Sequence, residues 1–126
     1  IEKLYLKKDI ILTGFFPQEY LPALINGARA VIYPSVYEGF GLPVLEAMSC
    51  AKPVLISNIS SLPEVGGEAA VYFDPYDIMD IADKMLCTLE NQQLMEILSK
   101  KSLVQSKRFS WERCAKETVD VYRKLF

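Results

Sequence analysis

The apolar residues of the chain follow two alternating patterns, short continuous runs and positions at helical spacing. The runs are rich in β-branched and aromatic residues and are followed by Gly, Pro, Ser or Asp, which predicts strands. The expected strands are Ile10–Thr13, Val31–Tyr33, Val54–Ile56 and Ala69–Phe73. Helices are expected over residues 18–28, 43–50, 61–65 and 91–107, and after the capping residues Asp77 and Ser110. Strands that alternate with helices indicate an α/β fold with parallel connections.

The length and the first residues bound the domain organisation. With 126 residues, 51% of them hydrophobic, the chain is the size of one domain with one core. Residues 1–8 are typical of the end of a helix whose last turn is basic. A chain that begins inside a helix looks truncated, so we expect residues 1–126 to form a partial domain.

Composition and charge exclude several classes of function. The net charge of −2 leaves no basic footprint, so nucleic acid is not an expected partner. The chain has no histidine, the commonest general base and metal ligand, and no metal is expected. The cysteines Cys50, Cys87 and Cys114 show no metal-ligand spacing, and we interpret them as reduced, buried thiols. Without a signal peptide or an apolar run of roughly 18–20 residues, a soluble, cytoplasmic protein is expected.

The candidate chemistry lies between residues 31 and 47, where a strand leads through a glycine-bearing loop into a helix. Pro43 suits the first position of that helix because its missing N–H has no partner there. The loop amides lie in or just before an uncapped helix start, where unpaired donors and the positive end of the dipole favour an anion. These amides belong to Gly39, Phe40, Gly41 and Leu42. The pattern therefore predicts a phosphate-type pocket at the carboxyl end of a strand.

Two glutamates flank this loop. Glu38 stands at its mouth, and Glu46 lies about one turn into the helix. Both can accept hydrogen bonds from hydroxyl groups, such as those of a ribose and a sugar. The alternative interpretation is an ordinary connection in which glycines form the turn and glutamates complement the helix start.

The segment EGFGLPVLE, with glutamates at Glu38 and Glu46, resembles the signature of retaining, nucleotide-sugar-dependent glycosyltransferases of the GT-B fold, group 1 or family 4. The resemblance implies that Glu38 is the catalytic residue at the donor sugar hydroxyls and that Glu46 binds the ribose of the nucleotide. It also implies that the glycine-loop amides meet the diphosphate. A nucleotide-diphosphate sugar would then be the donor substrate, with no further cofactor.

The resemblance extends to both sides of the signature. The segment FFPQEYLPALINGARAVIYPS resembles the family's approach to it, which makes Phe16 and Pro17, with Phe15, candidates for a wall beside the nucleotide base. The alternative is that the two phenylalanines are core residues that cap the sheet. Ala51 stands where the family usually has glycine at a left-handed helix end.

The resemblance also implies what the chain lacks. The expected strands match the last four strands of a Rossmann-like domain with spatial order 3-2-1-4-5-6. The first two strands of such a domain are therefore absent. In space they would lie between Ile10–Thr13 and Val31–Tyr33. Either these flanking strands pair directly, or another chain supplies the surface, or the chain is part of something larger. We expect a fragment, without the family's diphosphate-binding Arg and Lys and without the amino-terminal acceptor domain.

The expected function is therefore half of a donor site in a retaining glycosyltransferase. The isolated chain would bind nucleotide weakly or not at all and would not catalyse sugar transfer. A non-catalytic nucleotide-sugar binding module and a GT-B epimerase or phosphorylase remain alternatives. Membrane contact is expected only through the missing domain, and self-association through unpaired surfaces is plausible. The final helix resembles one that crosses back to the amino-terminal domain, so part of its apolar face would lack a partner.

Overall fold

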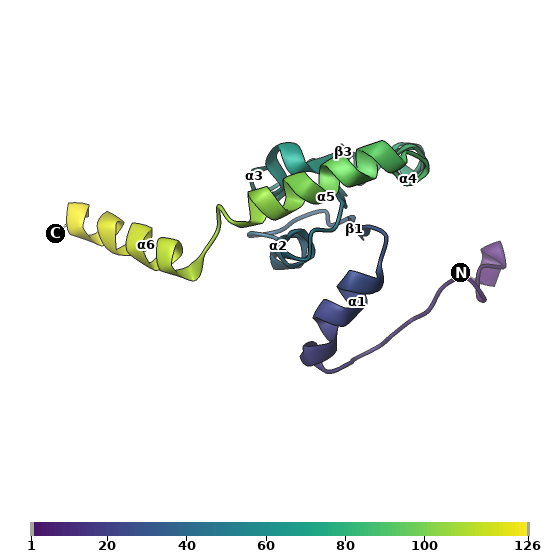
Figure 1. The fold of residues 1–126 in the computed structure, drawn as a ribbon, viewed down its shortest axis with the longest axis horizontal. Helices are drawn as coiled ribbons and strands as arrows, with labels where there is room; N and C mark the ends of the chain where they lie inside the picture. Colours follow the sequence, from purple (N-terminus) through teal and green to yellow (C-terminus); the bar gives the residue numbers. More distant parts are fainter. Residues whose placement is uncertain (1, 126) are drawn as a thin grey trace.

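The centre of the protein is a small parallel sheet. The structure, a computed structural model, describes residues 2–125 (Figure 1). In that range three strands are hydrogen-bonded in the order of the sequence: β1 (Val31–Tyr33), β2 (Val54–Ser57) and β3 (Ala70–Phe73). Both pairings are parallel, as expected. Every side chain of the central strand β2 is buried, which is typical of a parallel strand covered on both faces.

Helices join and cover the strands. They are α1 (Leu21–Gly27), α2 (Leu42–Ser49), α3 (Leu62–Gly66), α4 (Ile78–Glu90), α5 (Gln92–Ser106) and α6 (Trp111–Leu125). Short 3-10 turns lie at η1 (Glu2–Leu4), η2 (Gln18–Tyr20) and η3 (Gly67–Ala69). Helix α2 packs on β1 and β2, whereas α5 lies alongside α2, α3 and α4 (Figure 1). Helix α6 extends away from this body at one end, and the amino-terminal segment leaves it at the other.

The core lies between the sheet and helices α2 and α3. Val44 and Met48 of α2 and Leu62 and Val65 of α3 are completely buried against the strands. Their spacing of three or four residues along each helix places them on one face. This packing fixes the start of α2 relative to the end of β1, which is where the candidate chemistry lies.

Two predictions for the amino-terminal segment are wrong. The predicted strand Ile10–Thr13 is irregular, with Ile11 86% and Leu12 81% exposed. The described sheet therefore has three strands instead of four, and direct pairing of this segment with β1 is not present in residues 2–125. Residues 2–4 form only a 3-10 turn where a helix end was predicted, and residue 1 lies outside the described range.

The helix boundaries follow their capping signals closely. The carboxylate of Asp77 accepts hydrogen bonds from the N–H groups of Met79 (2.9 Å) and Asp80 (3.2 Å), which confirms it as the cap of α4. Ser110 caps α6 in the same way through Arg113 N–H, at 3.1 Å. Ala51 has φ +55°, so the left-handed helix end implied by the resemblance is present although the residue is not glycine.

Burial differs from the prediction at the cysteines, whereas the open apolar face of α6 was expected. The cysteines are not buried, because Cys50 is half-buried and Cys87 and Cys114 are exposed. Helix α5 buries Met95 and Leu98 but leaves Ile97 45% exposed. Helix α6 has core spacing but no buried residue, as Trp111 at 78% exposure illustrates. Its apolar face lacks a partner within residues 2–125.

No helix in that range is long and apolar enough to cross a membrane.

Candidate functional site

The glycine loop between β1 and α2 has a backbone shape that one residue determines. Gly41 has φ +101° and precedes α2, and its carbonyl accepts hydrogen bonds from the N–H groups of Val44 (3.0 Å) and Leu45 (3.3 Å). A Cβ atom at this position would lie 2.6 Å from Cδ2 of the buried Leu62. Both the positive φ and the close approach require glycine. The turn that starts α2 therefore follows directly from the sequence.

The amides of this loop are unpaired within the described residues, including that of the buried residue Gly41. No hydrogen bond within the described part of the chain uses the N–H of Gly39, Phe40, Gly41 or Leu42, and no side chain caps α2. Orphan donors at a helix start, with the positive end of the helix dipole behind them, favour an anion. The arrangement has the chemistry of a phosphate site.

Glu38 is held at the mouth of the loop by two hydroxyl groups. Tyr33 Oη donates to Glu38 Oε1 at 2.6 Å, and Ser35 Oγ lies 3.0 Å from the same oxygen. The hydrogen bond to Glu38, together with burial and the carboxylate charge, raises the pKa of the Tyr33 phenol. The other oxygen, Oε2, has no partner within residues 2–125 and is not sealed from solvent. One side of the carboxylate is thus fixed and the other is open.

The backbone of Glu38 is held as well, by the loop that follows β2. Ser60 Oγ accepts from Glu38 N–H at 3.2 Å and lies 2.5 Å from the Glu38 carbonyl oxygen, to which it donates. Ser61 Oγ donates to the same carbonyl at 3.0 Å. Because parallel strands end at the same edge of a sheet, the loops after β1 and β2 meet there. Glu38 is therefore positioned from both loops.

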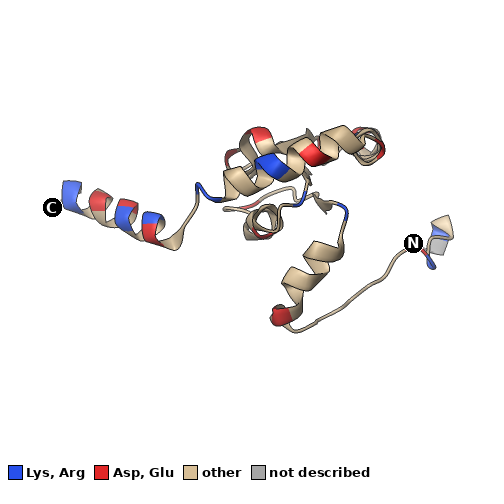
Figure 2. Cartoon of the chain, in the orientation of Figure 1, with Lys and Arg blue, Asp and Glu red and all other residues tan. Residues whose placement is uncertain are grey.

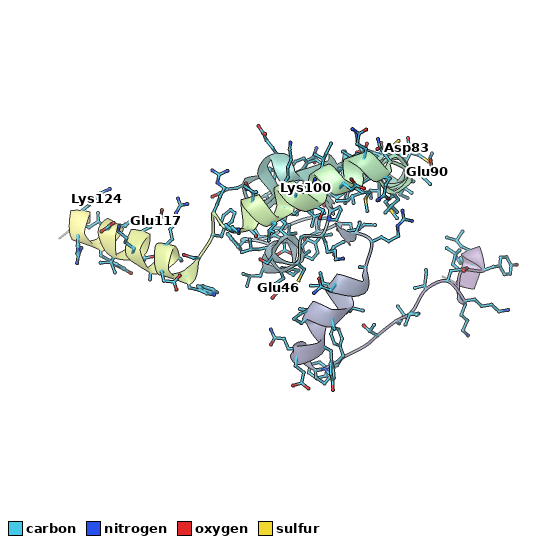
Figure 3. The ribbon with its side chains drawn as sticks, in the orientation of Figure 1. Glu46, Asp83, Glu90, Lys100, Glu117 and Lys124 are labelled. Atoms are coloured by element: carbon cyan, nitrogen blue, oxygen red, sulfur yellow. The ribbon has the colours of Figure 1, made fainter. Side chains whose placement is uncertain are left out.

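Glu46 lies in α2, four residues after the helix begins at Leu42. Its side chain is half-buried and forms no hydrogen bond or ion pair within the described range. Figure 3 shows it on the side of α2 that faces away from α5. No Lys or Arg occurs in the loop or in α2, which carry only acidic charge (Figure 2). Both glutamates are consequently available to accept hydrogen bonds from a ligand.

The structure brings together most of the predicted site residues but not all. Glu38, the four loop amides and Glu46 lie on one continuous strand-loop-helix unit. Phe16 and Pro17 precede η2, which lies at the end of α1 that is distant from the sheet (Figure 1). No described contact links them to the glycine loop, so the base-side wall stays a prediction. Phe15 is fully exposed, which contradicts the alternative that it caps the core.

Several contacts of the site were not predicted. The Phe40 ring meets the Phe109 ring edge to face, with centroids 5.6 Å apart, which ties the glycine loop to the connection between α5 and α6. Tyr33, Ser60 and Ser61 were likewise missed as partners of Glu38. For Tyr33, the available signal was a tyrosine at the carboxyl end of a strand and five residues before a glutamate. The sequence around the two serines indicated only a turn and no contact with Glu38.

An open hollow of about 460 Å³ lies elsewhere, between η3 and α5. Two of its three cations have acceptors: Lys101 Nζ donates to the Glu68 carbonyl (3.4 Å) and Arg108 Nη1 to Gln105 Oε1 (3.2 Å), whereas Lys100 has none within residues 2–125. It includes no residue of the glycine loop. Within residues 2–125, no group of His, Cys, Asp or Glu side chains is arranged to hold a metal ion.

Comparison with known proteins places this geometry in context. Residues 1–104 match the family described as glycosyl transferases group 1. The chain is 48% identical over 112 residues to the O-antigen chain mannosyltransferase B of Escherichia coli, covering 89% of the chain and 29% of that protein. It is 40% identical over 119 residues to the serotype-specific mannosyltransferase WbdA of Escherichia coli, covering 94% and 15%.

A solved structure agrees with the fold. Sucrose-phosphate synthase from Thermosynechococcus elongatus superposes with a TM-score of 0.87 at 28% sequence identity, covering 99% of this chain and 32% of that one. The chain therefore spans less than a third of the length of these relatives.

Proposed function

Because the chain belongs to the glycosyl transferases group 1 family, we propose that it forms part of the donor site of an enzyme that transfers a sugar from a nucleoside diphosphate with retention of configuration. The observation that carries the proposal is the set of unpaired amides at Gly39–Leu42, flanked by two carboxylates with open oxygens. The acceptor and the rest of the donor site would come from other parts of the full-length protein.

The loop amides serve the diphosphate in this proposal. As the bond from the sugar to the diphosphate breaks, negative charge grows on the leaving phosphate oxygens. Fixed N–H donors and the dipole of α2 stabilise that charge without reorganising, which is the usual source of large electrostatic effects in catalysis. Further cations, an Arg and a Lys by resemblance to the family, would come from a segment outside this chain.

The two glutamates bind the two carbohydrate rings. Oε2 of Glu38 accepts from hydroxyls of the donor sugar, and Glu46 accepts from the ribose hydroxyls. Hydrogen bonds to a charged acceptor contribute about 1.5–3 kcal/mol each, enough to fix the orientation of both rings. A correctly oriented donor is worth more to the rate than tight binding alone.

We propose mannose as the donor sugar. The support is the 48% and 40% identity to two proteins that are named as mannosyltransferases. The base of the nucleotide is tested together with the sugar, by comparing the GDP, UDP and ADP forms.

The test is calorimetry on the full-length protein with GDP, UDP and ADP, in wild type and in the Glu46→Ala variant. Loss of one charged hydrogen bond is expected to weaken the preferred nucleotide about tenfold or more. Glu90→Ala is the matched control, because Glu90 is an exposed glutamate at the end of α4. Unchanged affinity in Glu46→Ala would refute the ribose assignment.

A second measurement tests the reaction. Proton NMR of the first product formed from an α-linked nucleoside-diphosphate mannose should show an α-glycoside, since retention preserves the configuration. A β-glycoside would contradict retention. Nucleotide binding without any transfer, over a panel of acceptors, would favour a non-catalytic nucleotide-sugar binding module.

A further inference from the structure

Resting on the proposed role of Glu38, we infer that Tyr33 and Ser35 are positioning residues for the donor sugar. They bind one oxygen of the Glu38 carboxylate, so that the other is presented to the sugar hydroxyls. Both hydroxyl groups meet Oε1, and neither meets Oε2. A carboxylate that could rotate freely would exchange its two oxygens, whereas this one is locked by its partners.

Tyr33 is the stronger of the two partners. Its hydrogen bond at 2.6 Å lies at the short end of the range for a hydroxyl donating to a carboxylate. Tyr33 is also the last residue of β1, where Ile56 of β2 is its register partner, so the phenol projects from a fixed backbone. A donor on a paired strand holds its acceptor more rigidly than a donor on a loop.

Ser35 is the weaker partner of Glu38, because its hydroxyl proton has two possible acceptors. Ser35 Oγ lies 3.0 Å from Glu38 Oε1 and 3.1 Å from the carbonyl oxygen of Tyr37. A hydroxyl has one proton to donate, so these two acceptors compete for it. Removal of the Ser35 hydroxyl should therefore have a smaller effect than removal of the Tyr33 hydroxyl.

The backbone contacts separate this role from a general effect on the fold. Ser60 and Ser61 hold the main chain of Glu38 independently of Tyr33. Loss of the phenol hydroxyl should thus leave the loop amides in place and release only the carboxylate. The donor sugar would then bind in more than one orientation, which lowers the rate of transfer.

The experiment compares Tyr33→Phe and Ser35→Ala in the full-length protein, with Tyr76→Phe as the matched control. Tyr76 is 75% exposed in the turn before α4, and its hydroxyl makes no hydrogen bond within residues 2–125. The readouts are kcat and KM for transfer from the preferred nucleoside-diphosphate mannose. Calorimetry with the sugar-free nucleoside diphosphate and the melting temperature are measured on the same variants.

We expect Tyr33→Phe to lower kcat about tenfold, in line with loss of a hydrogen bond to a charged group, while affinity for the sugar-free nucleotide stays within about twofold. Ser35→Ala should show a smaller loss, and Tyr76→Phe none. In a Glu38→Ala background, Tyr33→Phe should cause no additional loss, because its acceptor is gone.

Three results would overturn the inference: kcat of Tyr33→Phe within twofold of wild type, an equal loss in the Glu38→Ala background, or a parallel loss of affinity for the sugar-free nucleotide. Failure of the proposed function looks different, because the wild-type protein itself would then bind nucleotide without transferring sugar. If only the role of Glu38 is wrong, Glu38→Ala alone transfers at the wild-type rate, before Tyr33 is considered.

Discussion

At the scale of single residues, the glycine loop depends most on Gly41. Its φ of +101° turns the chain into α2, and its missing Cβ leaves room for Leu62 Cδ2. Gly39, two residues earlier, has neither constraint: no atom lies within 4 Å of where a Cβ would stand, and its φ is outside the positive region. The two glycines therefore have different reasons to be present.

Gly41→Ala should destabilise the protein by about 2 kcal/mol, combining the cost of a left-handed backbone with overpacking against Leu62. Gly39→Ala is the matched control and should change the free energy of unfolding by less than about 0.5 kcal/mol. Chemical denaturation of the full-length variants measures both. Equal effects of the two substitutions would contradict the assigned roles.

Single residues also show where prediction from sequence stops. Gly41 and Glu46 were placed correctly, and Pro43 to within one residue because α2 begins at Leu42. Turn, helix start and helix position are local properties. The hydrogen bond from Tyr33 to Glu38 depends on how the chain bends after β1, and the bonds from Ser60 depend on a loop 22 residues away. The local pattern around Tyr33 suggests a partner for Glu38 but does not specify the bend, and no local pattern specifies the contact with Ser60.

At the scale of elements, the end of α2 combines a strained backbone conformation with hydrogen bonds that offset the strain. Ala51 adopts φ +55°, a conformation that costs an L-residue roughly 1–2 kcal/mol. The compensation is hydrogen bonding: the N–H of Ala51 donates to the Met48 carbonyl at 2.9 Å, and that of Lys52 to the Ala47 carbonyl at 3.1 Å. This left-handed ending directs the chain from α2 into β2.

Ala51→Gly should therefore stabilise the protein by about 1 kcal/mol, because glycine adopts the left-handed conformation without steric cost. Ala28→Gly provides the control. Ala28 follows α1 with an ordinary φ of −75°, so glycine there should give no gain. The midpoint of denaturant unfolding distinguishes the two. A loss of stability in Ala51→Gly would show that the strain is relieved in some other way.

Elements differ in how well the sequence predicts them. Helices with a capping side chain and a helical apolar pattern, such as α4 after Asp77, were found close to their true limits. The predicted strand Ile10–Thr13 has suitable residues but no neighbouring strand to pair with among residues 2–125, and a strand is stable only within a sheet. Strand propensity therefore identified the segment without determining its structure.

At the scale of the whole molecule, α6 is an α-helix that has an apolar face but no buried residue. Its apolar residues recur at helical spacing, but Val119 is 45% exposed and Tyr122 61% exposed. The charged residues between these apolar positions are of both signs (Figure 2). An amphipathic helix whose apolar face is open to water favours association.

The 126-residue chain, prepared alone, should therefore self-associate as its concentration rises. The double substitution Val119→Lys with Tyr122→Lys should abolish this association by placing charge on the apolar face. Glu117→Lys is the control, since it changes the net charge by the same two units on the polar face. Sedimentation velocity measures the outcome. Association that persists in the double variant would exclude α6 as the contact surface.

The proposed function depends on binding of the donor diphosphate at the start of α2. The most direct measurement is a crystal structure of the full-length protein with the preferred nucleoside-diphosphate mannose bound. We expect diphosphate oxygens within about 2.7–3.2 Å of at least two amide nitrogens of residues 39–42. We also expect a sugar hydroxyl on Oε2 of Glu38. A bound donor whose diphosphate lies elsewhere, with these amides hydrogen-bonded only to water, would contradict the proposed function.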